Sequence, residues 1–296
     1  MDERAWLTER FEEHRPRLRA VAYRMLGSLS EADDAVQESW LRLSRADTSS
    51  VENLAGWLTT VVARVCLNML RTRESRREEP LDVHMPDPII SHEDGGDPEQ
   101  EALLADSVGL ALLVVLDTLT PAERLAFVLH DIFAVPFEEL APMIERSPAA
   151  ARQLASRARC RVRGAAPAPD PDLTRQREVV DAYFAAVRDG DFDALVAVLH
   201  PDVVLRSDGG TARARQTVVI RGGRDVAAQA VRARRLAPFV RPALINGTAG
   251  VVATARGRAF AVMAFTVAHG KIVAIDVLSD PERLADLDLA VLDDSP

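Results

Sequence analysis

The sequence predicts a multidomain protein with two all-α modules followed by a C-terminal α+β module. Three observations support this. Apolar residues recur at three- and four-residue spacing over residues 4–72 and again from about residue 103 to 162. Segments rich in Pro separate these modules, and strand-like runs appear only after residue 200. The 296-residue chain is also long for one domain.

The first module, residues 1–77, is predicted to contain three helices. The apolar pattern of the first helix ends at Gly27, a residue that favours the left-handed conformation after a helix. We expect Ser30 to be the N-cap of a second helix that runs to about residue 43. A third helix is predicted over residues 54–73.

A linker rich in Pro, Gly and acidic residues is predicted at 78–105, mostly extended or disordered. The second helical module follows at 106–164. Thr120-Pro121-Ala122-Glu123 has the form of a capping box. Two short helices over 136–163, separated by a three-residue turn, predict a helix-turn-helix.

A second linker at 165–173 precedes the third module, residues 174–290. Helices are predicted at 173–189, 192–199 and 223–236. The strands predicted for this module are 203–206, 217–221, 243–245, 251–255, 259–268 and 272–278.

Composition excludes several classes of protein. The formal net charge of −9 argues against a histone-like DNA binder, which would be strongly basic. It does not exclude DNA binding through local basic patches. Cys66 and Cys160 have no partners at metal-ligand spacing, so we expect neither a disulfide nor a zinc site, as suits a reducing cytoplasm. The N-terminus lacks the pattern of a signal peptide, and the longest strongly apolar run, 108–116, is too short to span a bilayer. We expect a cytoplasmic protein without a membrane partner.

The second helix of the helix-turn-helix carries the strongest functional pattern. Its small apolar residues recur at helical spacing, which leaves a basic and polar face outside. Arg, Gln and Ser in the first turns of such a helix reach base edges, and later arginines contact phosphates. The predicted DNA-binding residues are Arg152, Gln153, Ser156, Arg157 and Arg159. The alternative is an ordinary helix with a solvated basic face.

Two further helices in the first module suit binding to large partners. Aromatic, basic and amide residues are interleaved over 53–71, as on surfaces that bind opened DNA; the residues are Asn53, Trp57, Arg64, Asn68 and Arg71. Trp57 alone fits a core anchor better. Acidic and apolar residues alternate faces over 33–40, which suits a partner-binding helix or a solvated acidic face; the residues are Asp33, Asp34, Gln37, Glu38 and Trp40.

Together these segments resemble a known family. The order of Asp33-Asp-Ala-Val-Gln-Glu38, Trp57-Leu-x-x-Val-x-x-Arg64, a linker and a helix ending in Arg157-Ala-Arg159 is similar to extracytoplasmic-function sigma factors of RNA polymerase. The sequence closely resembles the SigJ-like subgroup, which carries a fused SnoaL-like domain of the NTF2 superfamily. The resemblance covers nearly the whole chain and is most specific in 20–77 and 120–160.

The resemblance implies a fold and partners. The first module, residues 1–77, would be sigma region 2, a bundle of three or four helices. The second, residues 106–164, would be sigma region 4, a helix-turn-helix, and the C-terminal module, residues 174–290, would be an NTF2-like cone. The acidic helix would bind the β′ clamp helices of the polymerase core, with the β flap as a second core contact. The loop at 44–53 and the helix at 54–73 would recognise and melt the −10 element, with a flipped base held in a pocket at that loop. Region 4 would read the −35 element, and the linker would thread toward the active-site channel.

Several positions depart from the family pattern. Pro142 removes a hydrogen bond from the first helix of the helix-turn-helix, and Glu145 stands in the turn where the family often has Gly. Met85-Pro-Asp-Pro88 replaces the subgroup's Trp-Leu-Pro-Glu-Pro. Residues 208–213 only approximate Asp-Gly-Gly-Gly-Arg, and Asp280-Pro-Glu-Arg-Leu284 resembles Asn-Pro-Asp-Lys-Leu.

The C-terminal module offers two candidate pocket carboxylates, Asp208 and Asp276. We expect His200 to lie at a helix end and His269 to be exposed in a hairpin turn. No pair has a spacing that requires acid–base chemistry, so we predict no catalytic residue, no cofactor and no metal, and allow for a small-molecule ligand. The resemblance implies a domain that tunes promoter opening. Two other hypotheses remain: a one-component helix-turn-helix regulator with a ligand domain, and a SnoaL-like enzyme with a DNA-binding appendage.

Overall fold

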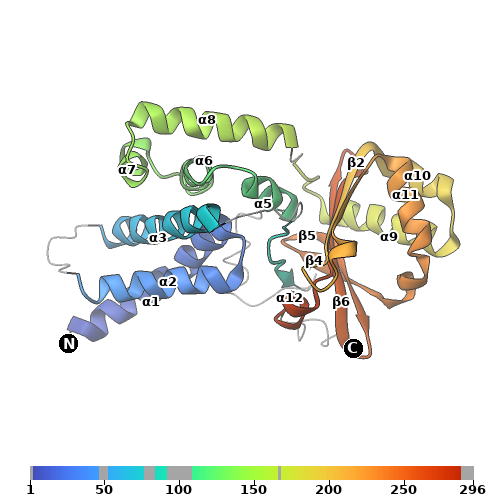
Figure 1. The fold of residues 1–296 in the computed structure, drawn as a ribbon, viewed down its shortest axis with the longest axis horizontal. Coiled ribbons are helices and arrows are strands. Elements are labelled where there is room, and N and C mark those ends of the chain that lie inside the picture. Colours follow the sequence, from blue (N-terminus) through green and yellow to red (C-terminus); the bar gives the residue numbers. More distant parts are fainter. Residues whose placement is uncertain (1–2, 47–52, 77–83, 92–108, 166–167, 288–296) are drawn as a thin grey trace. The chain divides into compact units, whose positions relative to one another are not determined.

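The computed structural model describes residues 3–46, 53–76, 84–91, 109–165 and 168–287 (Figure 1). Contacts divide the chain into two compact units. The first comprises residues 1–79, 101–106 and 115–165, and the second comprises 80–100, 107–114 and 166–296. The division falls within helix α5 (Leu110–Asp117). No helix among the described ranges is long and apolar enough to cross a membrane.

The first unit begins with helices α1 (Glu3–Leu26), α2 (Leu29–Leu43) and α3 (Leu54–Arg76). Gly27 has φ 75°, so α1 ends at a left-handed residue as predicted. The prediction that Ser30 caps α2 was wrong. The N-cap is Ser28, whose hydroxyl accepts a hydrogen bond from the Glu31 amide, and Ser30 lies inside the first turn. Extended backbone at Ser28 makes this geometry possible.

The second half of this unit contains α6 (Pro121–Phe127), the π-helix η1 (Val128–Ile132), α7 (Phe137–Leu140), the 3-10 helix η2 (Ala141–Met143) and α8 (Pro148–Ala165). The capping box at the start of α6 is confirmed: Thr120 and Glu123 bond reciprocally. Pro142 lies in η2, where the chain tightens after a single α-helical turn. Glu145 adopts φ 55°, which costs a non-glycine residue about 1–2 kcal/mol.

A buried arginine joins the two halves of the first unit. Arg124 of α6 is 2% exposed. Its Nε donates to the carbonyl of Arg24 in α1 (3.2 Å), and its Nη1 donates to Asp117 (2.9 Å). Burial lowers the pKa of Arg124, and the Asp117 carboxylate opposes that change. Phe133 adds a second contact, because the guanidinium groups of Arg17 and Arg24 lie 5.7 and 5.2 Å from its ring centre.

The second unit is built on a seven-stranded sheet of order β1-β4-β5-β6-β7-β2-β3. All neighbours are antiparallel except β2 and β7. The strands are β1 (Ile90–Ser91), β2 (Leu199–Asp208), β3 (Val218–Arg221), β4 (Val240–Ile245), β5 (Thr248–Ala255), β6 (Arg258–Ala268) and β7 (Lys271–Leu278).

Helices α9 (Leu173–Asp189), α10 (Phe192–Val198) and α11 (Gly223–Arg232) cover one face of this sheet (Figure 1). The space between is filled by an apolar core in which Tyr183, Phe184 and Phe265 form mutual edge contacts at 5.2–5.8 Å. Shorter helices complete the unit: η3 (Ala214–Gln216), η4 (Arg234–Phe239) and α12 (Pro281–Ala285).

One helix limit predicted for this unit was wrong. The third helix ends at Arg232 and is followed by the 3-10 helix η4, which contains Pro238. His200 follows α10 by two residues, at a helix end as predicted, but it belongs to β2, which begins at Leu199 and contains an irregularity before Val204. Residues 84–91 of the linker are extended, as predicted, and they end in β1, which pairs with β4. His269 is exposed at the β6–β7 turn, as predicted.

Candidate nucleic-acid and polymerase interfaces

Helix α8 has a clear division between a buried and an exposed face. Ala151, Ala155 and Ala158 are fully buried. The hydroxyl of Ser147 accepts a hydrogen bond from the Ala150 amide, so the helix starts where the sequence predicts. The exposed face near that start carries Arg152, Gln153, Ser156 and Arg157. These residues are therefore arranged as the first turns of a recognition helix require.

The later arginines of α8 contact the protein itself. Arg159 is half-buried and donates to Asp131 of η1 at 3.1 Å. Arg161 donates to Glu123 at 2.9 Å. Burial raises the pKa of the Asp131 carboxyl, and Arg159 opposes that rise. The predicted phosphate role of Arg159 therefore competes with an intramolecular ion pair.

Four of the five residues predicted to bind the −10 element lie along one stripe of α3. At about 100° per residue, Trp57, Arg64, Asn68 and Arg71 fall within about 60° of arc and extend over about 21 Å. Trp57 is half-buried and the other three are exposed. The stripe thus combines an aromatic face with cations and an amide.

The fifth residue, Asn53, has a local structural role. Its side-chain oxygen accepts a hydrogen bond from the Gly56 amide at 2.9 Å, which caps the start of α3. The flipped-base pocket was predicted at the loop 44–53, of which residues 47–52 lie outside the described residues.

The acidic helix α2 presents only part of its predicted interface to a partner. Asp33 receives two hydrogen bonds from Arg19 of α1, at 2.6 and 3.1 Å. Trp40 packs against Phe11, with ring centres 5.1 Å apart. Asp34 and Gln37 are exposed, and Glu38 is bonded to Arg42 one turn later. Asp34 and Gln37 therefore remain the most available predicted polymerase contacts on α2.

A groove of about 830 Å³ lies between α2 and α3. Asp34 and Glu38 line one wall, and Asn68 lines the other. The structure therefore brings predicted polymerase contacts and one predicted −10 contact into a single concave surface. The remaining lining residues are Glu31, Arg42, Val65, Met69, Thr72 and Arg73.

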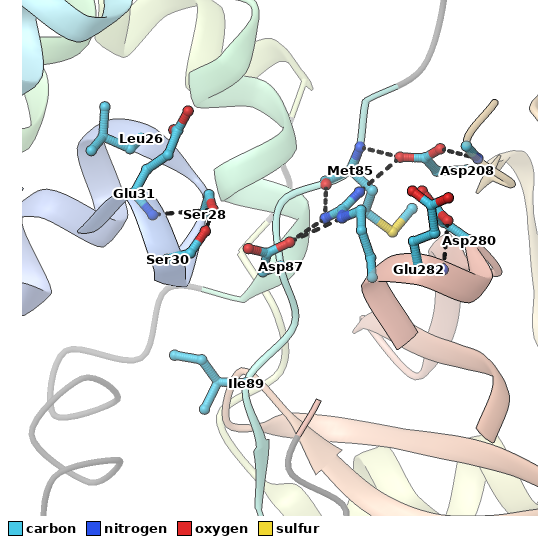
Figure 2. A network of polar contacts seen from close by, with 12 residues as sticks. Leu26, Ser28, Ser30, Glu31, Met85, Asp87, Ile89, Asp208, Asp280 and Glu282 are labelled. Carbon is cyan, nitrogen blue, oxygen red and sulfur yellow. Dashed lines mark hydrogen bonds and ion pairs between the residues drawn. The ribbon is translucent and has the colours of Figure 1, made fainter. Parts of the chain in front are cut away.

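Asp208, at the end of β2, is the centre of a network that fixes the linker (Figure 2). It is 5% exposed. Its Oδ2 accepts hydrogen bonds from the Met85 amide and from Arg283, both at 3.0 Å. Its Oδ1 accepts from the Gly210 amide at 2.9 Å. The carboxylate is thus fully used in structural contacts.

Arg283 of α12 completes this network. Besides Asp208, it donates to the carbonyl of Met85 and to Asp87 of the linker, both at 2.5 Å. We call Asp208, Arg283, Asp87 and the Met85 backbone the linker clamp. Sequence patterns assign no role to Arg283 or Asp87, although both lie in segments that resemble the subgroup's motifs.

A second attachment lies farther along the linker. The Ile89 amide donates to the side chain of Asn246 at 3.1 Å, and the Asn246 amide donates to the Ile89 carbonyl at 2.8 Å. Ile90 and Ser91 then pair with Ile245 and Leu244. Residues 85–91 are therefore held at both ends by the second unit.

The second predicted pocket residue, Asp276, lies on the sheet face away from the aromatic core. Its neighbours Ile275 and Val277 face that core, so Asp276 faces the opposite side. It is 1% exposed and accepts a hydrogen bond from Arg206 at 2.8 Å, yet its Oδ2 and the Arg206 Nη2 have no partner. Burial raises the pKa of the Asp276 carboxyl, and Arg206 opposes that rise.

The described residues contain no group of three or more His, Cys, Asp or Glu side chains that could bind a metal ion. Asp208 and Asp276 share the sheet face opposite the aromatic core. Arg206 of β2 lies directly beside Asp276 of β7, and Asp208 follows Arg206 by two positions, so all three side chains lie on the same face. They are partners of arginines and do not line a common pocket in the core.

Comparisons with known proteins agree with this arrangement. Residues 10–76 match Sigma-70 region 2, and residues 109–161 match Sigma-70 region 4. The ECF RNA polymerase sigma factor SigJ of Mycobacterium tuberculosis is 40% identical over 288 residues, which cover 92% of this chain and 91% of that protein. The probable sigma factor SigI of the same species is 36% identical over 275 residues, 92% of each protein.

The crystal structure of M. tuberculosis SigJ superposes with a TM-score of 0.76 at 35% identity, and the match covers 95% of this chain and 99% of that one. Both helical regions and the sheet-containing unit are included in a match of this extent. The chain therefore belongs to the extracytoplasmic-function family of RNA polymerase sigma factors.

Proposed function

We propose that this sigma factor recognises the −10 element through the α3 stripe and the −35 element through the start of α8. The observation that carries the proposal is the α3 stripe of half-buried Trp57 with exposed Arg64, Asn68 and Arg71, which combines stacking and phosphate-binding groups. The groove beside it, with Asp34 and Glu38, supports polymerase binding through α2. By family, the partners are RNA polymerase core and promoter DNA; the clamp helices and the flap are the surfaces we propose.

The first unit would have to open to bind both promoter elements at once. The names of the elements place them about 25 base pairs apart, roughly 85 Å at 3.4 Å per base pair. A compact unit of this size has a radius of gyration of only about 14 Å. The bond from Arg124 to the Arg24 carbonyl holds its halves together. Polymerase binding would therefore replace that bond.

We further propose that the C-terminal domain modulates activity by holding the linker. The linker clamp holds Met85 and Asp87, and the pairing of β1 with β4 holds Ile90 and Ser91. A segment held in this way is unavailable to the polymerase channel until these bonds break. The side chains of Tyr183, Phe184 and Phe265 fill the space between the helices and the sheet. This supports regulation through the held linker in preference to regulation through a ligand bound in that space.

Run-off transcription with bacterial core polymerase tests both proposals. Promoters would be selected from a genomic pool, and the full-length protein would be compared with a chain ending at residue 166. Specific transcripts from either form support promoter recognition, and the difference between the forms gives the sign of the C-terminal effect. Absence of core binding and of transcripts from both forms would favour a one-component regulator instead. Equal output under several conditions would argue against modulation by the C-terminal domain.

A further inference from the structure

The C-terminal domain contains a long segment with charge of one sign. Residues 226–275 include six arginines and Lys271, and no Asp or Glu. The whole chain nevertheless has a formal net charge of −9. Such segregation creates a positive local potential on an acidic protein.

Four of these arginines lie toward one end of the sheet. Arg256 and Arg258 are at the turn between β5 and β6, and Arg241 is near the start of β4. Because Val240 pairs with Ala253, the start of β4 and the β5–β6 turn are at the same end. Arg235 lies in η4, which leads directly into β4. All four arginines are exposed.

An exposed aromatic side chain lies among these arginines. Phe239, the last residue of η4, is 45% exposed, and its ring centre lies 6.3 Å from that of Phe260 in an edge-to-face arrangement. No carboxylate among the described residues pairs with Arg235, Arg256 or Arg258. We call Arg235, Phe239, Arg241, Arg256 and Arg258 the cationic rim.

We propose that the cationic rim is a nucleic-acid-binding surface that is separate from both promoter-reading helices. The guanidinium groups would bind backbone phosphates, since their planar forks match phosphate oxygens. Phe239 would provide a face on which an unpaired base can stack. An acidic protein surface would satisfy the charges, but it would leave the exposed Phe239 without a matching group. The combination of arginine and an exposed aromatic ring therefore favours nucleic acid.

The test is fluorescence anisotropy of the full-length protein with a labelled 30-mer that lacks promoter sequence, as a duplex and as a single strand. The variant is R235A/R256A/R258A. If three phosphate contacts are lost, the slope of log affinity against log salt becomes shallower by about 2.7 for the duplex and about 2.1 for the single strand. Affinity at low salt should fall on the order of tenfold. F239A should weaken binding to the single strand more than to the duplex.

Three controls separate this surface from others. R235K/R256K/R258K keeps the positive charges without the planar forks, so its affinity should lie between those of the natural protein and the alanine variant. R175A removes an exposed arginine at the start of α9 and should change nothing. R152A/R157A alters α8, and its effect should add to that of the rim variant.

An unchanged salt slope in R235A/R256A/R258A overturns the proposal, as does equal weakening by R175A. Binding of an acidic polypeptide in preference to both DNA forms would overturn it in favour of a protein partner.

Discussion

Asp208 and Arg283 form an ion pair of 3.0 Å that encloses one residue of the linker between them. Asp208 accepts from the amide of Met85, while Arg283 donates to the carbonyl of the same residue. Both backbone polar groups of Met85 are therefore satisfied by side chains of the second unit. Met85 itself is 1% exposed, so the pair fixes the linker where it is also desolvated.

Removal of Arg283 should release this part of the linker. R283A leaves Asp208 and Asp87 without their shared cation, so we expect faster amide hydrogen exchange at Met85 and Ile89. Exchange measured by mass spectrometry over peptides that cover 84–91 tests this. E282A, which alters the neighbouring exposed residue of α12, is the matched control. Unchanged protection at Met85 in R283A would show that β1 alone holds the linker.

The ion pair of Arg206 and Asp276 should behave as a buried pair. Loss of one partner leaves an uncompensated charge, so D276A should lower the free energy of unfolding of the second unit by about 3–5 kcal/mol. The double variant R206M/D276L removes both charges and should be close to neutral or more stable. Calorimetric melting of the natural protein, D276A and R206M/D276L measures both effects. A double variant as unstable as D276A would contradict this account.

The same pair predicts a pH dependence. Burial raises the folded-state pKa of Asp276, so its contribution to stability is fully present below the unfolded pKa of about 3.9. That contribution is lost as pH rises through the higher folded pKa. The melting temperature of R206M/D276L relative to the natural protein should therefore increase with pH above about 4. A difference that is constant between pH 4 and pH 8 would argue against it.

Arg152 should contribute to the sequence specificity of region 4. Its side chain is exposed in the first turns of α8, with the guanidinium 5.1 Å from the ring centre of Phe137. If Arg152 contacts a base edge, R152A should cost ~1–3 kcal/mol at one position of the −35 element. Transcription from a library of single-base promoter variants measures this. Uniform weakening over all promoters would instead identify a phosphate contact.

Loss of Arg124 should loosen the first unit. R124M removes the buried bonds to Asp117 and to the Arg24 carbonyl, so we expect a loss of about 3 kcal/mol. All three tryptophans, Trp6, Trp40 and Trp57, belong to this unit, so denaturation followed by tryptophan fluorescence reports it selectively. R15A removes an exposed pair with Glu12 and should be neutral. Equal stability of R124M and the natural protein would exclude this role.

Local rules were sufficient for much of the helical architecture. Gly27 ends α1, Thr120 and Glu123 cap α6, and alanines at helical spacing form the buried face of α8. Each depends on residues within a few positions of one another. The prediction of the N-cap of α2 was wrong because serine is a good N-cap at either position 28 or 30. Only the backbone conformation selects Ser28.

Two of the candidate site residues could not be interpreted from local pattern. Asp208 and Asp276 suited a pocket by composition, yet their partners Arg283 and Arg206 lie 75 and 70 residues away along the chain. Alternation along β7 predicts that Asp276 and Ile275 point to opposite faces of the sheet. Only the packing of the helices shows which of the two faces covers the aromatic core.

The sequence by itself determined the order of modules, most helix limits, the family and the exposed face of α8, because these follow from periodicity, capping and motif order. The tertiary structure alone decided that the linker forms β1 and the linker clamp, that Arg124 joins the halves of the first unit, and that Asp33 and Arg159 are already paired. The reason is physical. Ion pairs and strand pairing join residues distant in sequence, and whether a charged side chain is available depends on which partner the fold places beside it.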